Sequence, residues 1–179
     1  NTDVIGVELG GALKNIIALA AGVVDGLGYG DNAKATLVTR GLAEITALGV
    51  AVGANPLTFA GLAGLGDLMA TCASPLSRNH HVGVELTKGR PLDEITATMT
   101  GVAEGVSTTR ATWEIARDLG LEMPITEQMY RVLNDGLDPE RAAVELMGAQ
   151  ARHELAGRRW ELFSLFRQQG RPRSRQSTG

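Results

Sequence analysis

The sequence predicts an all-α fold, and three observations support this. Aromatic residues, which favour strands, make up only 4% of the 179 residues. The valines and isoleucines recur mostly at spacings of three and four positions rather than two, which is the period of a helix face. Hydrophobic residues make up 44% of the chain, enough for one ordinary domain with a core of its own.

The N-terminal third predicts two long helices joined by a glycine-rich turn. The first helix runs from about Val7 to Val24 and has a broad apolar face. The turn occupies Gly26 to Gly30. Asp31 or Asn32 is expected to accept from the free amides that open the second helix, which ends near Gly53.

The middle of the chain predicts shorter elements. Pro56 starts a short segment, and Gly61, Gly64 and Gly66 surround an apolar run whose glycines indicate close backbone contact. A helix of about one and a half turns follows over Asp67 to Cys72.

Capping residues place the remaining helices. Ser77 is the expected N-cap of a helix that stops at Gly89, and Pro91 opens another short one. Helices are then predicted over about Glu104 to Leu119, Ile125 to Leu133 and Pro139 to Met147. A last helix is expected near Arg152 to Phe166, with disorder beyond Gly170.

Charge divides the chain unevenly. The net charge is −3, yet the tail from Arg158 to Gly179 carries six arginines and one glutamate, so the rest carries about −8. We therefore expect a substrate-binding domain over residues 1–157 and a basic, disordered tail over 158–179. The acidic body argues against nucleic acid as a partner.

Several features indicate a cytoplasmic protein. The chain has one cysteine, Cys72, which excludes an intramolecular disulfide. The sequence shows no signal-peptide pattern at its start. The apolar run from Ile16 to Val24 is interrupted nearby by charge and is too short to span a bilayer, so no membrane span is expected.

Lys14 is the most unusual charge in the sequence, because it lies among apolar residues of a predicted helix. Its ammonium group must reach an acceptor or a cavity, or else the residue is a surface lysine whose stem covers apolar neighbours. Asn15 beside it adds a hydrogen-bond donor and acceptor that a purely structural helix interior does not need.

A second polar cluster follows the glycines. It contains a carboxylate, hydroxyls, a guanidinium and an amide, on Asp67, Thr71, Ser77, Arg78 and Asn79. An arginine in the first turn of a helix adds a bidentate fork to free backbone amides, which suits the phosphate of a small polyol. The alternative is an ordinary N-cap followed by a solvent-facing arginine.

The sequence contains no pattern typical of a metal site or of a dinucleotide-binding fold. His80 and His81 are adjacent and His153 lies far away, so no pair at metal-ligand spacing exists, and no metal site is expected. No Gly-x-Gly-x-x-Gly motif follows a strand, so the chain does not build a dinucleotide-binding fold by itself.

Five ordered motifs carry a resemblance to a known family. They are Gly10-Gly11-Ala12-Leu13-Lys14-Asn15, Thr39-Arg40-Gly41-Leu42-Ala43-Glu44, Gly64-Leu65-Gly66-Asp67-Leu68, Ser77-Arg78-Asn79 and Met123-Pro124-Ile125-Thr126. Together they resemble the C-terminal, substrate-binding domain of the bacterial NAD(P)-dependent sn-glycerol-3-phosphate dehydrogenases. The similarity covers about Thr2 to Glu154.

The resemblance implies a helical domain of the two-domain 6-phosphogluconate-dehydrogenase-like superfamily, which normally packs against an N-terminal Rossmann domain that is absent here. It implies an oxidoreductase that interconverts dihydroxyacetone phosphate and glycerol 3-phosphate with NADP or NAD, bound mainly by the absent domain, and that feeds glycerophospholipid synthesis. The isolated chain is expected to be inactive.

The resemblance also implies roles for single residues. The lysine matching Lys14 is the proton acceptor. Residues matching Asp67, Ser77, Arg78 and Asn79 bind substrate. Cofactor contacts fall on Arg78, Val102 and Glu104.

General chemistry is consistent with these roles. Hydride transfer to a ketone leaves an alkoxide, which an ammonium group can protonate. Asn15 and Thr71 are expected to add hydrogen bonds to the substrate. Two alternatives remain at this point: a related hydroxy-acid dehydrogenase, whose substrate usually lacks the phosphate, and a non-catalytic helical module that forms a homodimer.

Overall fold

The structure is a computed structural model that describes residues 2–148. The chain divides into two compact units, Asn1–Val144 and Glu145–Gly179. Every regular element among the described residues is a helix, which confirms the predicted all-α class. The helix predicted near Arg152 to Phe166 and the disorder predicted beyond Gly170 lie outside the described residues.

The helices follow one another with short connections. In chain order they are α1 (Val4–Gly26), α2 (Gly30–Ala51), α3 (Pro56–Ala60), the π-helical turn η1 (Leu62–Gly66), α4 (Asp67–Ala73), α5 (Arg78–Thr87), α6 (Leu92–Ala97), α7 (Glu104–Asp118) and α8 (Pro124–Asn134). Residues 139–148 are also helical, in agreement with the helix predicted there.

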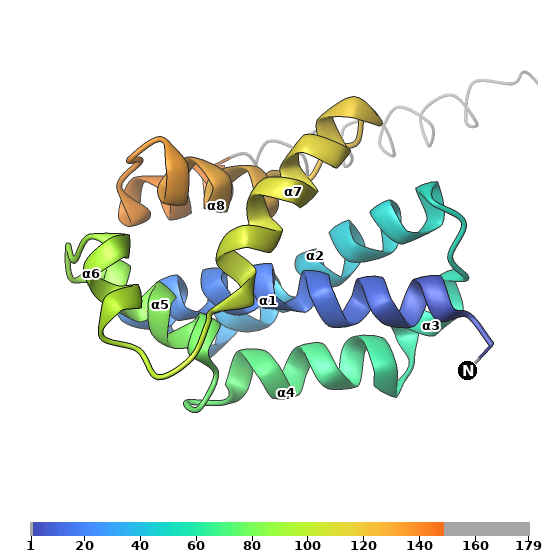
Figure 1. Ribbon diagram of the computed structural model, residues 1–179, viewed down its shortest axis with the longest axis horizontal. Helices are drawn as coiled ribbons and strands as arrows, with labels where there is room; N and C mark the ends of the chain where they lie inside the picture. Colours follow the sequence, from blue (N-terminus) through green and yellow to red (C-terminus); the bar gives the residue numbers. More distant parts are fainter. Residues whose placement is uncertain (1, 149–179) are drawn as a thin grey trace, which may run out of the picture. The chain divides into compact units, whose positions relative to one another are not determined.

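Helix α1 is the centre of the first unit (Figure 1). Its most extensive contacts are with α5, α2, α7 and α4, and every residue from 15 to 24 is buried. The N-terminal half keeps an exposed strip that includes Val4, Ile5 and Ala12. The N-terminal half of α1 is therefore partly exposed and its C-terminal half is buried by other helices, and Lys14 lies at the boundary between the two.

The prediction that the apolar run of α1 is too short to span a bilayer was wrong. The run belongs to a helix of 23 residues, which is long and apolar enough to cross a membrane by length and composition alone. The core of the unit accounts for this composition, because most of that helix is buried against other helices.

The predicted cap of the second helix was also wrong. Neither Asp31 nor Asn32 caps α2, whose N-cap is Tyr29 and which has no side-chain cap bond. Gly28 and Gly30 adopt positive φ angles of 73° and 80°, so the chain turns within three residues and the helix begins earlier. By contrast, Ser77 caps α5 as predicted, since its Oγ accepts from the His80 amide at 3.3 Å.

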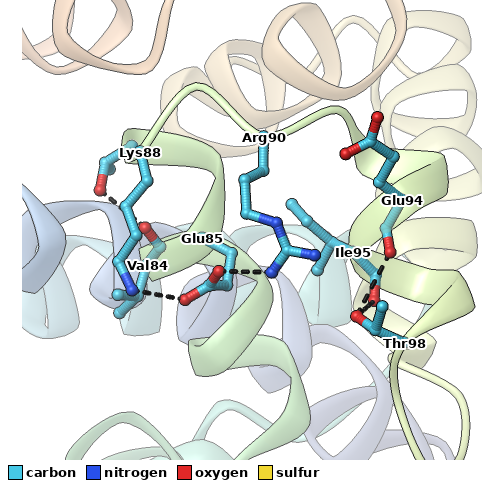
Figure 2. A network of polar contacts seen from close by, with 8 residues as sticks. Val84, Glu85, Lys88, Arg90, Glu94, Ile95 and Thr98 are labelled. Carbon is cyan, nitrogen blue, oxygen red and sulfur yellow. Dashed lines mark hydrogen bonds and ion pairs between the residues drawn. The ribbon is translucent and has the colours of Figure 1, made fainter.

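Figure 2 shows a polar network that holds the turn between α5 and α6. The two carboxylate oxygens of buried Glu85 accept from Lys88 Nζ and Arg90 Nη1, each at 2.6 Å. These hydrogen bonds lower the pKa of Glu85 to about 2. After α6, Thr98 donates to the carbonyls of Glu94 and Ile95. These bonds fix the end of α5, the turn after it and the end of α6, which lie just before the segment that leads to α7.

Glu44 of α2 holds the start of α8. Its buried carboxylate accepts from the amides of Ile125 and Thr126, at 2.6 and 3.2 Å, and from the Thr126 hydroxyl at 3.1 Å. Free amides in the first turn of a helix need such acceptors. Burial raises the pKa of Glu44 to about 7, although these three hydrogen bonds act in the opposite direction.

This raised pKa makes the stability of the domain depend on pH. The folded state binds a proton more tightly than the unfolded state, whose glutamate has a pKa near 4.5. The contribution of Glu44 is therefore complete below pH 4.5 and is lost as the pH rises through 7. We expect the free energy of unfolding of Glu44→Gln to lack this decrease, which amounts to about 1–3 kcal/mol.

Denaturant unfolding of both proteins between pH 5 and 8 measures the difference, in which the other titrating groups cancel. Parallel pH profiles for the two proteins would contradict the assignment.

Candidate functional site

Lys14 and Asp67 form an ion pair between α1 and α4. The Lys14 ammonium donates to Asp67 Oδ2, although 53 positions separate the two residues. Asp67 is the first residue of α4, which follows the π-helical turn η1 without a break, so this carboxylate lies within one continuous helical segment. The side chains are 21% and 41% exposed, so a ligand can reach the pair.

Thr71 lies one turn further along α4. Its hydroxyl donates to the Asp67 carbonyl at 2.7 Å and lies 3.5 Å from Asp67 Oδ1. The hydroxyl is therefore on the Asp67 side of the helix and keeps lone pairs that can accept from a ligand. Lys14, Asp67 and Thr71 form one polar group.

Asn15 and Asn79 form a second, buried polar group. Asn79 Nδ2 donates to Asn15 Oδ1 at 3.0 Å, and Asn79 Oδ1 accepts from the Gly105 amide at 2.9 Å. Asn15 Nδ2 in turn lies 3.4 Å from Glu104 Oε2. Because both amides are only 7% exposed, these bonds join α1, α5 and the first turn of α7 in a fixed arrangement.

The structure adds Gly105 to the predicted site. A Cβ on Gly105 would lie 2.7 Å from the Asn15 carbonyl oxygen and 2.9 Å from Asn79 Oδ1. Only glycine lets α7 begin this close to α1. The sequence interpretation missed the residue, although a glycine directly after Glu104 is a signal of close backbone approach.

Arg78 reaches toward the segment before α7. A Cβ on Gly101 would lie 2.6 Å from Arg78 Nη1, so the guanidinium group rests over this glycine, whose φ is 100°. Val102 and Glu104 are both exposed just beyond it. The hydroxyl of Ser77 is occupied as the cap of the helix that Arg78 begins. Arg78 itself is exposed and accessible to an anion.

The predicted residues therefore come together through one stretch of α1. Lys14 belongs to the group around Asp67, whereas its neighbour Asn15 belongs to the group around Asn79. Asn79 is the second residue of α5 and directly follows Arg78. The Arg78 guanidinium in turn lies against Gly101, the residue before Val102. The Lys14–Asp67 group and the Asn15–Asn79 group are thus adjacent along α1, and Arg78 directly precedes Asn79 of the second group.

A further ion cluster lies apart from these groups and was not predicted. Asp25 Oδ2 pairs with Lys34 Nζ at 2.7 Å and with His80 Nε2 at 2.8 Å. It joins α1, α2 and α5. Within residues 2–148, no three His, Cys, Asp or Glu side chains are grouped so that they could hold a metal ion.

Comparison with known families now adds to this geometry. Residues 3–144 match the family model described as NAD-dependent glycerol-3-phosphate dehydrogenase C-terminus. The chain belongs to this family. The match covers all of the described helices that form the site, and it extends to the end of the first compact unit.

Curated relatives carry the same family name. The chain is 68% identical over 167 residues to a glycerol-3-phosphate dehydrogenase [NAD(P)+] of Dehalococcoides mccartyi strain 195, covering 93% of this chain and 46% of that protein. It is 57% identical over 169 residues to one of Geobacillus thermodenitrificans, covering 94% and 48%. The chain thus spans about half the length of these relatives.

Solved structures of this family share the fold. A glycerol-3-phosphate dehydrogenase from Coxiella burnetii superposes with a TM-score of 0.80 at 44% identity, covering 82% of this chain and 45% of that one. The enzyme from Saccharomyces cerevisiae gives 0.73 at 30% identity, covering 80% and 42%. The all-α C-terminal domain predicted from the sequence is confirmed for this family member.

Proposed function

We propose that this chain is the substrate-binding half, with the catalytic lysine, of an enzyme that interconverts dihydroxyacetone phosphate and sn-glycerol 3-phosphate using NAD(P)H. The observation that carries the proposal is the ion pair of Lys14 with Asp67, accessible to ligand and adjoining the buried Asn15–Asn79 pair. The family match supports this reading over a hydroxy-acid dehydrogenase or a non-catalytic module.

Lys14 supplies the proton in this proposal. Reduction of the ketone places negative charge on the oxygen of the middle carbon, and the Lys14 ammonium protonates it. In the oxidation direction the neutral amine accepts the same proton. Asp67 holds the ammonium group in position, and the Thr71 hydroxyl adds a hydrogen bond to the substrate.

Arg78 fixes the phosphate. Its guanidinium group offers a planar fork at the N-terminus of α5, where free amides and the helix dipole also favour an anion. Asn79 keeps α5 tied to α1, so the phosphate position and Lys14 are held at a constant separation. Binding the phosphate thereby positions the carbonyl carbon for reaction.

Only the residues beside the start of α7 are proposed to contact the cofactor. NAD(P)H supplies the hydride when bound. Arg78, Val102 and Glu104 are exposed, and the Arg78 guanidinium rests over Gly101 in the segment that precedes α7, so these side chains form the edge that can contact the cofactor. The described residues contain no strand and no glycine-rich turn after one, so the nucleotide end requires another domain.

Apolar residues near the site offer a surface for that domain. Leu62, Met69, Leu76 and Val102 are between 56% and 90% exposed, and each is close in sequence to Asp67, Arg78 or Glu104. Exposed apolar side chains of this size are typical of an interface where another part of the protein covers them. We propose that the dinucleotide-binding half of the full-length enzyme covers these side chains.

The test is reduction of dihydroxyacetone phosphate, followed by oxidation of NADH or NADPH. We expect turnover when the chain is joined to the N-terminal half of the Dehalococcoides relative, and negligible turnover from the 179-residue chain alone. A folded fusion without turnover would refute the proposed function.

Arg78→Lys in that fusion tests the phosphate contact. A point charge replaces the planar fork, so we expect the KM for dihydroxyacetone phosphate to rise about tenfold or more, as for a lost charge-assisted hydrogen bond. The matched control is Arg110→Lys, which changes an exposed arginine paired with Glu114 on α7. An unchanged KM in Arg78→Lys would contradict the assignment.

A further inference from the structure

Gly11 is a glycine that this domain does not itself require. It lies in the middle of α1, where glycine costs about 0.5–1 kcal/mol relative to alanine. Its φ is not among the positive values that favour glycine. A Cβ added at Gly11 would have no atom within 4 Å, whereas a Cβ at any other glycine of α1 would meet a neighbouring group.

The open space at Gly11 lies beside the candidate catalytic lysine. Residues three apart share a helix face, so Gly11 and Lys14 are neighbours on α1. Side chains of a helix lean toward its N-terminus, so the Lys14 stem runs alongside this turn. Even so, no atom of Lys14 lies within 4 Å of the added Cβ. The gap is therefore not space that the lysine itself occupies.

The order of groups along α1 indicates what enters this gap. Asn15, on one side of Lys14, leads through Asn79 to Arg78, the proposed phosphate contact. Gly11 shares a helix face with Asn15, four positions later, and lies about one turn from Lys14 toward the N-terminus of α1, the opposite direction along the helix axis from Asn15. A substrate whose phosphate lies at Arg78 and whose carbonyl lies at Lys14 therefore extends its remaining end toward Gly11.

We infer that Gly11 is a specificity-determining residue, whose missing side chain makes room for the terminal hydroxymethyl group of a three-carbon phosphorylated ketone. The inference rests on the proposed function. A methyl group added at this position would clash with the hydroxymethyl carbon of the ketone. It would not clash with a shorter substrate that ends at the reacting carbon.

The experiment compares two substrates in the fusion enzyme carrying Gly11→Ala. Dihydroxyacetone phosphate has the hydroxymethyl group, whereas glycolaldehyde phosphate lacks it and presents the same phosphate and a reducible carbonyl. We expect kcat/KM to fall about tenfold or more for the ketone, as for one misfitting methylene in a pocket. For the aldehyde we expect kcat/KM to stay near the wild-type value.

Gly148→Ala is the matched control, because Gly148 is also helical with no atom within 4 Å of an added Cβ. It should change neither kcat/KM value. Thermal unfolding of the 179-residue chain should show Gly11→Ala at least as stable as wild type, which separates loss of activity from loss of folding.

An equal loss for both substrates, or no loss for the ketone, would overturn the role of Gly11. Failure of the proposed function looks different, because the unsubstituted fusion would then reduce neither substrate.

Discussion

Lys14→Met in the fusion enzyme is expected to lower kcat for dihydroxyacetone phosphate by about a hundredfold or more. Methionine keeps an unbranched apolar stem but has no proton to give. Asp67 holds this ammonium in position, and the side chain of the adjacent Asn15 is an amide, which has no acidic proton to replace it and is bonded to Asn79 and Glu104. Steady-state rates at saturating substrate measure the effect.

Lys34→Met is the matched control for this substitution. Lys34 also pairs with a carboxylate, Asp25, and its side chain is 23% exposed, close to the 21% of Lys14. Its replacement removes an ion pair of similar exposure outside the site, so kcat should remain close to wild type. A Lys14→Met enzyme with near-normal kcat, or an equal loss in both variants, would exclude Lys14 as the proton donor.

Gly83→Ala is expected to have the largest effect on stability. A Cβ on Gly83 would collide with the Leu19 carbonyl oxygen and lie 2.8 Å from the Val23 amide nitrogen. Both atoms belong to the backbone of α1, so no side-chain rotation relieves the overlap, and α5 must move away from the buried core. We expect a loss of about 3 kcal/mol or more.

Thermal unfolding of the 179-residue chain tests this prediction. The expected loss corresponds to a decrease in Tm of about 10 °C or more for a domain of this size. Gly11→Ala is the matched control, since it adds the same methyl to a helical glycine with open space and should not lower Tm. A Tm for Gly83→Ala close to that of wild type would show that α1 and α5 are not packed as closely as described.

Local signals in the sequence predicted most helix positions. Ser77 is the N-cap of α5 as predicted, and Pro124 starts α8 one residue before the predicted start. The first helix begins at Val4 rather than Val7, because Asp3 is its N-cap and accepts from the Gly6 amide at 3.0 Å. This is an ordinary capping signal that the prediction overlooked. Such boundaries depend on groups within a few positions of each other, which is why a pattern can find them.

The two wrong predictions have different causes. Asp31 has a good capping side chain, but two glycines with positive φ turn the chain before it, and α2 begins at Gly30. The span of α1 looked too short because its charges interrupt the apolar run, whereas the helix continues through them. The first error came from the path of the chain through the two glycines, and the second from the length of a helix that includes its charged residues.

For the site residues, too, some features follow from the sequence and others only from the tertiary structure. The sequence alone determined the helical class, the residue types of the site and the family they resemble, because each of these is written in local spacing and composition. Only the tertiary structure brought Lys14 to Asp67, joined Asn15 to Asn79 and showed that Gly105 is needed for this contact. The two pairs are separated by 53 and 64 positions, and the packing of α1 against α4 and α5 determines their distances.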